Sequence, residues 1–104
     1  EHRITLDICP TSNVKLRVAP SIAEHPIREL FDRGVPVTVS TDDPLMFMVT
    51  MSDEYAALSH ELGFTLAELR RTALAALSAA FVADGAKASL MPAVKAAFDR
   101  LGPE

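Results

Sequence analysis

The chain has 104 residues, which leaves room for one small domain with a modest hydrophobic core. Its 49% hydrophobic and 23% charged residues are typical of a soluble globular protein, and no apolar stretch approaches the ~20 residues of a membrane-spanning helix. A net charge of −4 with scattered Lys and Arg argues against binding to nucleic acid or to an anionic membrane. The single cysteine, Cys9, excludes an internal disulfide and favours a reducing, cytoplasmic location.

The first twenty residues predict a strand followed by a loop. Residues 4–9 alternate well enough in hydropathy to form a strand, which Pro10 ends. Residues 11–21 predict a loop, because they are rich in Pro, Ser and Asn. The chain begins with Glu1 rather than Met, within the approach to this strand, so we expect it to be part of a longer protein.

A helix and a second strand are expected next. Pro26 suits the first turn of a helix, residues 27–31 supply its apolar face and Gly34 ends it. The β-branched residues 35–40 predict a buried strand. This order predicts two parallel strands joined by a right-handed crossover.

The C-terminal half is predicted to be helical. Ser52 or Asp53 can cap a helix that Gly63 closes, and Thr65 with Glu68 forms the capping box of another. A final helix should run from about residue 84 to 101, with Pro92 either starting it afresh or kinking it. The second of these helices carries an apolar stripe at helical spacing that we expect to be core: Leu66, Leu69, Ala73, Ala76, Leu77, Ala80 and Phe81.

Two interpretations of the fold remain open. Two parallel strands do not make a stable sheet alone, because parallel sheets need cover on both faces. The chain is therefore either a complete, helix-rich α/β domain or the last two βα units, with C-terminal helices, of a (β/α)8 TIM barrel. The pattern favours the barrel segment, with residues 1–104 as one part of a single domain.

Chemistry is expected where the second strand ends. The run of β-branched residues stops at two adjacent carboxylates, Asp42 and Asp43, followed by Pro44. In α/β sheets and barrels the carboxyl ends of the strands form the functional edge. Consecutive strand residues point to opposite faces, so both acids serve one pocket only if the backbone bends between residues 41 and 44.

Three ordered motifs carry a resemblance to a known family. They are Cys-Pro-Thr-Ser-Asn at 9–13, Ala-Glu-His-Pro-Ile at 23–27 and Ser-Thr-Asp-Asp-Pro at 40–44. Gly-Phe-Thr at 63–65 and Ala-Ala-Phe at 79–81 follow in the same order. Together they resemble the adenosine and adenine deaminases over nearly the whole chain.

The resemblance implies a zinc-dependent hydrolase that removes the 6-amino group of a purine as ammonia. It places a zinc-ligating carboxylate on Asp42 and a contact to the purine N7 on Asp43. Carboxylate oxygens bind zinc well, and zinc activates a water molecule for attack. The second acid can hold a ring nitrogen if it is protonated. Ser12 is expected to line the substrate pocket from the preceding strand.

The rest of the family's machinery lies outside this sequence. The family's zinc-binding histidines, its acid/base glutamate and its catalytic histidine have no match here, and His2, His25 and His60 stand in other contexts. We therefore expect the isolated chain to be inactive and to need the N-terminal barrel portion. Without that portion it should self-associate.

Structural roles compete with these functional ones. Asp-Asp-Pro is often only a turn or a helix N-cap, and the side chains of residues 12–13 can equally cap their own loop. His25 is expected to be structural, and Cys9 a small buried hydrophobe. Residues 46–48 either wall a purine pocket or pack beneath the loop, and we favour packing.

The substrate and the class of protein also stay open at this level. Adenosine, adenine and a modified purine nucleoside all fit the motifs, because residues 13–18 look closer to adenine deaminases and residues 45–55 closer to the nucleoside enzymes. Ser40, where many members carry Asn, leaves the subgroup undecided. The alternative from another class is a free-standing, non-catalytic α/β interaction module.

Overall fold

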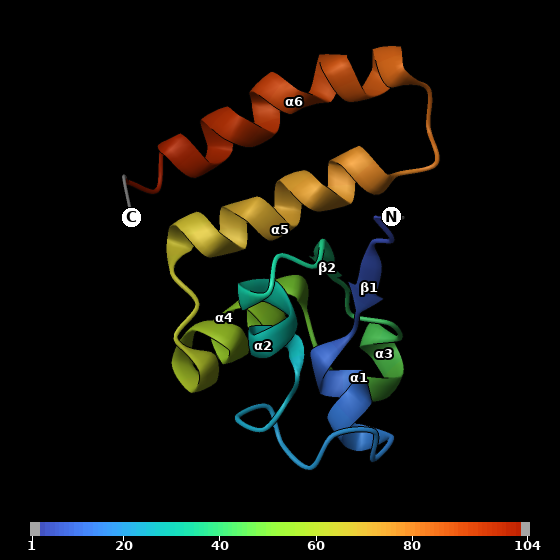
Figure 1. Cartoon of the computed structure of the whole chain (residues 1–104), viewed down its shortest axis with the longest axis vertical. Coiled ribbons are helices and arrows are strands. Elements are labelled where there is room, and N and C mark those ends of the chain that lie inside the picture. Colours follow the sequence, from blue (N-terminus) through green and yellow to red (C-terminus); the bar gives the residue numbers. More distant parts are fainter. Residues whose placement is uncertain (1–2, 103–104) are drawn as a thin grey trace.

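The computed structural model describes residues 3–102, so His2 lies outside the described residues. The chain is α/β and rich in helix (Figure 1). Its elements, in chain order, are β1 (Leu6–Ile8), α1 (Pro10–Lys15), α2 (Ile27–Asp32), β2 (Val37–Val39), α3 (Pro44–Phe47), α4 (Met51–Leu62), α5 (Leu66–Ala79) and α6 (Asp84–Asp99). None of the helices within residues 3–102 has the length and apolar character needed to cross a membrane.

The two strands pair in parallel, as the sequence predicts. Leu6 faces Val37 and Ile8 faces Val39 in the register of the pair. Backbone bonds extend the ladder at both ends, from the Leu6 amide to the Pro36 carbonyl at 2.9 Å and from the Ser40 amide to the Ile8 carbonyl at 2.8 Å. Both strands are shorter than expected.

Part of the expected loop at residues 11–21 is instead the helix α1, so that prediction was wrong. Pro10 occupies its first turn, and the amide of Asn13 donates to the carbonyl of Cys9 at 2.8 Å. The helix ends before Arg17, whose φ of 62° turns the chain. Pro, Ser and Asn favour loops, but they also favour the first turn of a helix, and composition alone does not separate the two.

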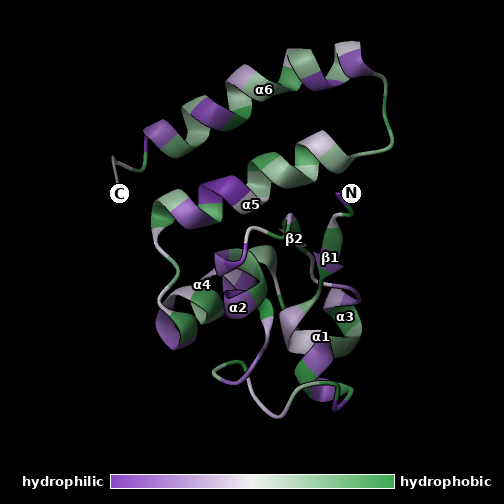
Figure 2. Cartoon of the chain, viewed as in Figure 1, coloured by the Kyte–Doolittle hydropathy of each residue, from purple (hydrophilic) through white to green (hydrophobic). Residues whose placement is uncertain are grey.

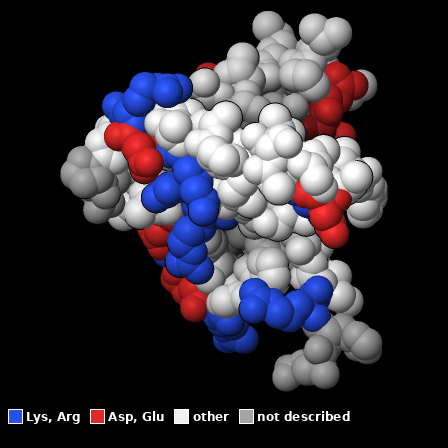
Figure 3. Space-filling view, turned by 90° about the horizontal axis from the view of Figure 1, so that it is seen from above, with Lys and Arg blue, Asp and Glu red and all other residues white. Residues whose placement is uncertain are grey.

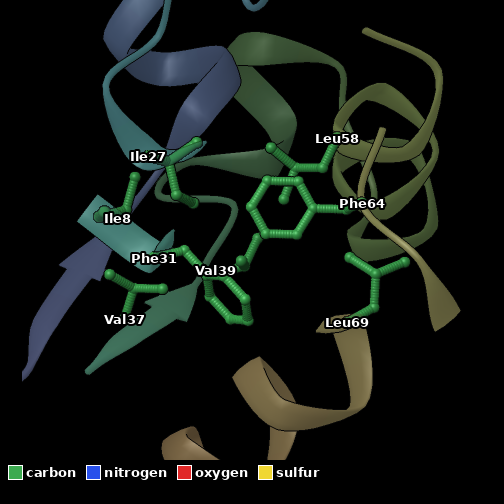
Figure 4. Close-up of a cluster of buried hydrophobic side chains, with 8 residues drawn as sticks. All are labelled: Ile8, Ile27, Phe31, Val37, Val39, Leu58, Phe64 and Leu69. Carbon is green, nitrogen blue, oxygen red and sulfur yellow. The ribbon is translucent and has the colours of Figure 1, made fainter. Parts of the chain in front are cut away.

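The hydrophobic core lies on one face of the sheet. Figure 4 shows its side chains pointing toward one another from both strands and from the helices packed on them. The rings of Phe31 and Phe64 meet edge to face with their centroids 5.3 Å apart, a favoured aromatic arrangement. The cluster comprises Ile8, Ile27, Phe31, Val37, Val39, Leu58, Phe64 and Leu69.

The last two helices form the outer layer of the molecule. α5 packs on β2, and α6 lies along α5 on the side away from the sheet (Figure 1). α6 runs unbroken through Pro92, so of the two alternatives for this proline the start of a new helix does not occur. None of the residues of α6 is fully buried. Apolar and polar residues are mixed along its length (Figure 2), and its outer face combines flanking charges with a broad uncharged area (Figure 3).

Capping residues set the boundaries of the C-terminal helices. Thr65 and Glu68 form the predicted capping box of α5. α4 begins earlier than expected, because Thr50 is its N-cap and Asp53 completes the box as the third helical residue. Gly63 closes α4 with a φ of 65°, a left-handed conformation that glycine adopts without strain.

Two expectations about buried residues need correction. Of the predicted core stripe on α5 only Leu69 is buried. Four members are half-buried (Leu66, Ala73, Leu77 and Ala80), whereas Ala76 and Phe81 are exposed, so the prediction that the whole stripe is core was wrong. Of residues 46–48, Phe47 packs beneath the loop as favoured, but Met46 and Met48 are exposed. Cys9 is half-buried rather than buried.

An ion pair joins α2 to α5 beside the core. The Arg28 guanidinium bonds to Glu68 on α5 and to Asp32 on its own helix, and it lies over the Phe64 ring at 4.3 Å. The hydrogen bond from Arg28, with the Thr65 amide also donating, lowers the pKa of Glu68 to about 2. This carboxylate therefore both caps α5 and fixes it against α2.

Replacing this carboxylate tests how much the link stabilises the fold. Glu68→Gln should lower the free energy of unfolding at pH 7 by about 1–2 kcal/mol, because it removes a charge-assisted pair. Since the folded-state pKa is lowered, the stabilisation is present above about pH 4.5 and is lost as the pH falls toward about 2. Urea denaturation at pH 7 and at pH 3 measures both effects. The exposed Glu61→Gln on α4 is the control, and equal losses in the two variants would contradict the role of Glu68.

Candidate functional site

The candidate site lies where β1 and β2 end. Because the strands are parallel, their carboxyl ends meet at one edge, with α1 following β1 and the acidic bend following β2. The predicted bend is present: Asp42 has a φ of 63°, a left-handed conformation that Asp tolerates better than most residues. The Ser12 hydroxyl on α1 donates to Oδ2 of Asp42 at 2.8 Å.

The Asp43 side chain makes a different hydrogen bond from that of Asp42. Its Oδ1 accepts the Met46 amide at 2.9 Å, which makes it the N-cap of the four-residue helix α3. The helix-cap interpretation of the acidic pair therefore holds for Asp43. The side chain is exposed and its second oxygen accepts no bond from residues 3–102.

The two polar residues of α1 separate into distinct roles. Ser12 is 2% exposed and points at Asp42 rather than capping its own segment. Oδ1 of Asn13 lies 2.9 Å from Nε2 of His25, so Asn13 ties α1 to the chain before α2. Both bonds fix α1 at the edge of the sheet where the acids lie.

His25 is a structural residue, as expected. Its Nδ1 accepts the Ile27 amide at 3.0 Å, so the ring proton is assigned to Nε2, which then donates to Asn13. Burial lowers the pKa of His25, because the charged ring would lose its hydration. A neutral imidazole therefore suits both of its bonds.

The lowered pKa of His25 predicts a loss of stability in mild acid. The unfolded chain takes up a proton below about pH 6.5 while the folded chain resists it, so stability is complete above that pH and falls below it. The slope from this one group reaches at most about 1.4 kcal/mol per pH unit. Denaturation from pH 7 to 5 should show this slope reduced in His25→Gln. The exposed His60→Gln should retain it, and a slope unchanged in both variants would contradict the assignment.

Cys9 lies at the base of the site, directly after β1, and is half-buried. Burial raises the pKa of the Cys9 thiol, and the charges of Asp7, Asp42 and Glu54 raise it further. A thiol in these surroundings stays protonated and is a poor nucleophile. Cys9 is thus not a candidate catalytic group.

Glu54 belongs to this neighbourhood, and the sequence analysis missed it. It lies in the first turn of α4 and is 0% exposed, and its Oε2 accepts the Thr11 amide at 3.2 Å. Its Oε1 is buried with no hydrogen-bond partner among the described residues. The only available signal was an acid in the first turn of a helix, which usually indicates a favourable interaction with the helix dipole.

The metal-binding capacity of the site is partial. No group of three or more His, Cys, Asp or Glu side chains able to hold a metal occurs within residues 3–102. Asp42 fits the part of one ligand, because Ser12 holds one carboxylate oxygen and the other accepts no bond from the described chain. A complete coordination sphere would need side chains from beyond these residues.

The sheet face opposite the core carries polar side chains and adjoins a cavity. Oδ1 of Asp7 accepts the hydroxyls of Thr38 at 2.8 Å and Ser40 at 2.6 Å, across the two strands. A cavity of about 450 Å³ adjoins this face between the strands and the end of α5. It is lined by Thr5, Asp7, Thr38, Ser40, Ala76, Ala79, Ala80 and Phe81.

Comparison with known proteins gives consistent matches. The sequence model of the family described as adenosine deaminase matches residues 1–97. An adenine deaminase of Sinorhizobium medicae is 40% identical over 94 residues, which are 90% of this chain and 29% of that protein. The chain thus spans less than a third of the length of this curated relative.

Solved structures resemble the chain closely over a similar share. The Arabidopsis protein ADAL, solved as a complex with IMP, superposes with a TM-score of 0.86 at 32% identity, covering 94% of this chain and 29% of that one. An amidohydrolase from Burkholderia ambifaria, solved with bound zinc, gives a TM-score of 0.83 at 31% identity, covering 95% and 28% respectively.

Proposed function

This chain belongs to the adenosine deaminase family, and from that premise we propose that it supplies the C-terminal part of a zinc-dependent deaminase acting on a 6-aminopurine. The single observation that carries the proposal is the acidic bend, where Ser12 bonds to one oxygen of Asp42 and no side chain within residues 3–102 bonds to the other. The names of the relatives support a purine substrate, and the zinc in one neighbour supports the choice of metal.

In this proposal Asp42 is a zinc ligand. The Ser12 hydroxyl uses Oδ2 and so limits rotation of the carboxylate, which leaves Oδ1 for the metal. The left-handed backbone turns the side chain away from the strand axis and toward the edge where α1 begins. A bound zinc ion would activate a water molecule for attack on the purine carbon that carries the amino group.

Asp43 and Ser12 line the substrate pocket in the same proposal. Asp43 uses Oδ1 to cap α3, which fixes its rotamer and presents Oδ2 toward solvent at the same edge. A carboxyl group at this place can hydrogen-bond the purine N7 when it carries a proton. Ser12 contributes to the pocket by positioning the Asp42 carboxylate, because its hydroxyl hydrogen is already donated to that group.

We further propose that the active protein is a (β/α)8 barrel in which this chain forms the last two βα units and the C-terminal helices. The two-stranded sheet has the core on one face and a cavity of mixed polar and apolar lining on the other, whereas parallel sheets are normally covered on both faces. The matched share of 28–29% of the neighbours' length agrees with such a part. The remaining zinc ligands and the acid/base groups would come from the other units.

The two carboxylates can be separated by substitution in the full-length protein that contains this chain. Asp42→Asn should weaken zinc binding and lower kcat by at least about 100-fold, because an amide is a poor zinc ligand. Asp43→Ser should keep the cap of α3 and the melting temperature, since Ser caps helices about as well as Asp. Its shorter side chain should reduce kcat/KM on adenine or adenosine by about 100-fold.

Zinc content, ammonia release and thermal melting measure these effects. Asp84→Asn, at the exposed start of α6, is the control and should match the wild type in all three. Zinc binding by Asp42→Asn equal to that of the wild type would refute the ligand role. Full activity of Asp43→Ser would leave that residue with its structural role alone.

The 104-residue chain by itself should be inactive and should self-associate. One carboxylate does not hold a catalytic zinc ion, and both strands have an open edge in a chain that also exposes Ile4, Leu45 and Phe81. Deaminase assays with added zinc and sedimentation at several concentrations measure the two expectations. Zinc-dependent turnover by the chain alone would refute the first. A monodisperse, folded monomer would favour the free-standing module instead.

A further inference from the structure

Glu54 is the most deeply buried charged side chain outside the proposed catalytic set. It is 0% exposed, in the first turn of a helix whose next turn carries the equally buried Leu58. A carboxylate without water is costly unless it makes hydrogen bonds. An apolar side chain of similar size would fill this space with less cost, so the bond that Glu54 makes is informative.

That bond supplies what α1 lacks at its own N-terminus. The N-cap residue of α1, Cys9, makes no side-chain cap bond, and Pro10 has no amide hydrogen to donate. The first free amide of the helix is that of Thr11, and it donates to Oε2 of Glu54, 43 residues later in the sequence. α4 thereby caps α1 across the fold.

The capped turn carries the side chain that holds the proposed zinc ligand. Ser12 directly follows Thr11, is 2% exposed, and donates its hydroxyl to Asp42 at 2.8 Å. Within residues 3–102, this is the only side-chain bond that the Asp42 carboxylate receives. Any shift of the first turn of α1 therefore moves the one group that orients Asp42.

We infer that Glu54 is a positioning residue, which fixes the first turn of α1 so that Ser12 orients the Asp42 carboxylate. This inference rests on the proposed function for its effect on zinc and catalysis. The contacts that lead from Glu54 through Thr11 and Ser12 to Asp42 belong to the fold and do not depend on the proposed function. α4 is a firm anchor for it, because a Thr50–Asp53 capping box fixes its start and Leu58 holds it in the core.

The test compares three substitutions in the full-length protein. Glu54→Leu keeps the volume and removes the acceptor, whereas Glu54→Gln keeps an oxygen that can accept the Thr11 amide. Glu61→Gln changes an exposed glutamate on the same helix. Glu54→Leu should weaken zinc binding and lower kcat by about 10-fold to 100-fold with little change in KM, the usual range for an outer-shell partner. Glu54→Gln should recover most of the loss, and Glu61→Gln should show none.

A double-mutant cycle with Ser12→Ala distinguishes positioning from general destabilisation. If Glu54 acts through Ser12, adding Glu54→Leu to Ser12→Ala should weaken zinc binding by no more than about 2-fold further. If the fold losses of zinc affinity in the two single variants multiply fully in the double variant, the inference is overturned. A Glu54→Leu protein that melts at lower temperature but binds zinc as the wild type does would also overturn it.

A readout without zinc keeps this inference separate from the proposed function. In the metal-free protein, amide hydrogen exchange at Thr11 should be at least about 10-fold faster in Glu54→Leu than in the wild type, and the Asp42 carboxyl ¹³C shift should move toward its value in Ser12→Ala. Unchanged exchange and an unchanged shift would overturn the link. If the wild type neither binds zinc nor releases ammonia, while Glu54→Leu still shows both changes relative to it, the proposed function is overturned. Glu54 then remains the residue that supports Ser12.

Discussion

The parallel pairing of β1 with β2 is the constraint on which the rest of the structure depends. Three residue pairs set the register, and they bring the chain after Ile8 and the chain after Val39 to the same edge. Ser12 and Asp42 are 30 residues apart in sequence, and this pairing brings their elements close enough for a hydrogen bond of 2.8 Å. The core on one face of the sheet holds the register, because a slip of one residue would turn Val37 and Val39 away from it.

The edge of the sheet is held by side chains that come from well beyond the strands. His25 bonds to Asn13 and Glu54 to Thr11, so the short helix α1 is held in its first turn and at its middle. A six-residue helix has little stability of its own, and such contacts replace what length would provide. The acidic bend therefore rests on a supported helix rather than on a free loop.

The two faces of the sheet are buried to different extents, which is consistent with the proposal that this chain is one part of a larger barrel. α2, α4 and α5 pack closely around the aromatic pair, and the Arg28–Glu68 link joins two of them. The opposite face of the sheet carries hydrogen-bonded hydroxyls and a carboxylate beside a cavity, and no residue of α6 is fully buried. The hydrophobic core thus lies on one face of the sheet only, which agrees with the match of this chain to less than a third of the length of its curated relative.

The sequence by itself determined the family, the order of the main elements, the parallel pair and the acidic bend. These depend on local patterns, such as a β-branched run, a capping box or a motif of five residues. Only the tertiary structure decided that the Ser12 hydroxyl donates to Asp42 and that Glu54 is buried against the Thr11 amide. Each of these depends on which distant groups the fold brings together, and no local propensity encodes a partner thirty or forty residues away.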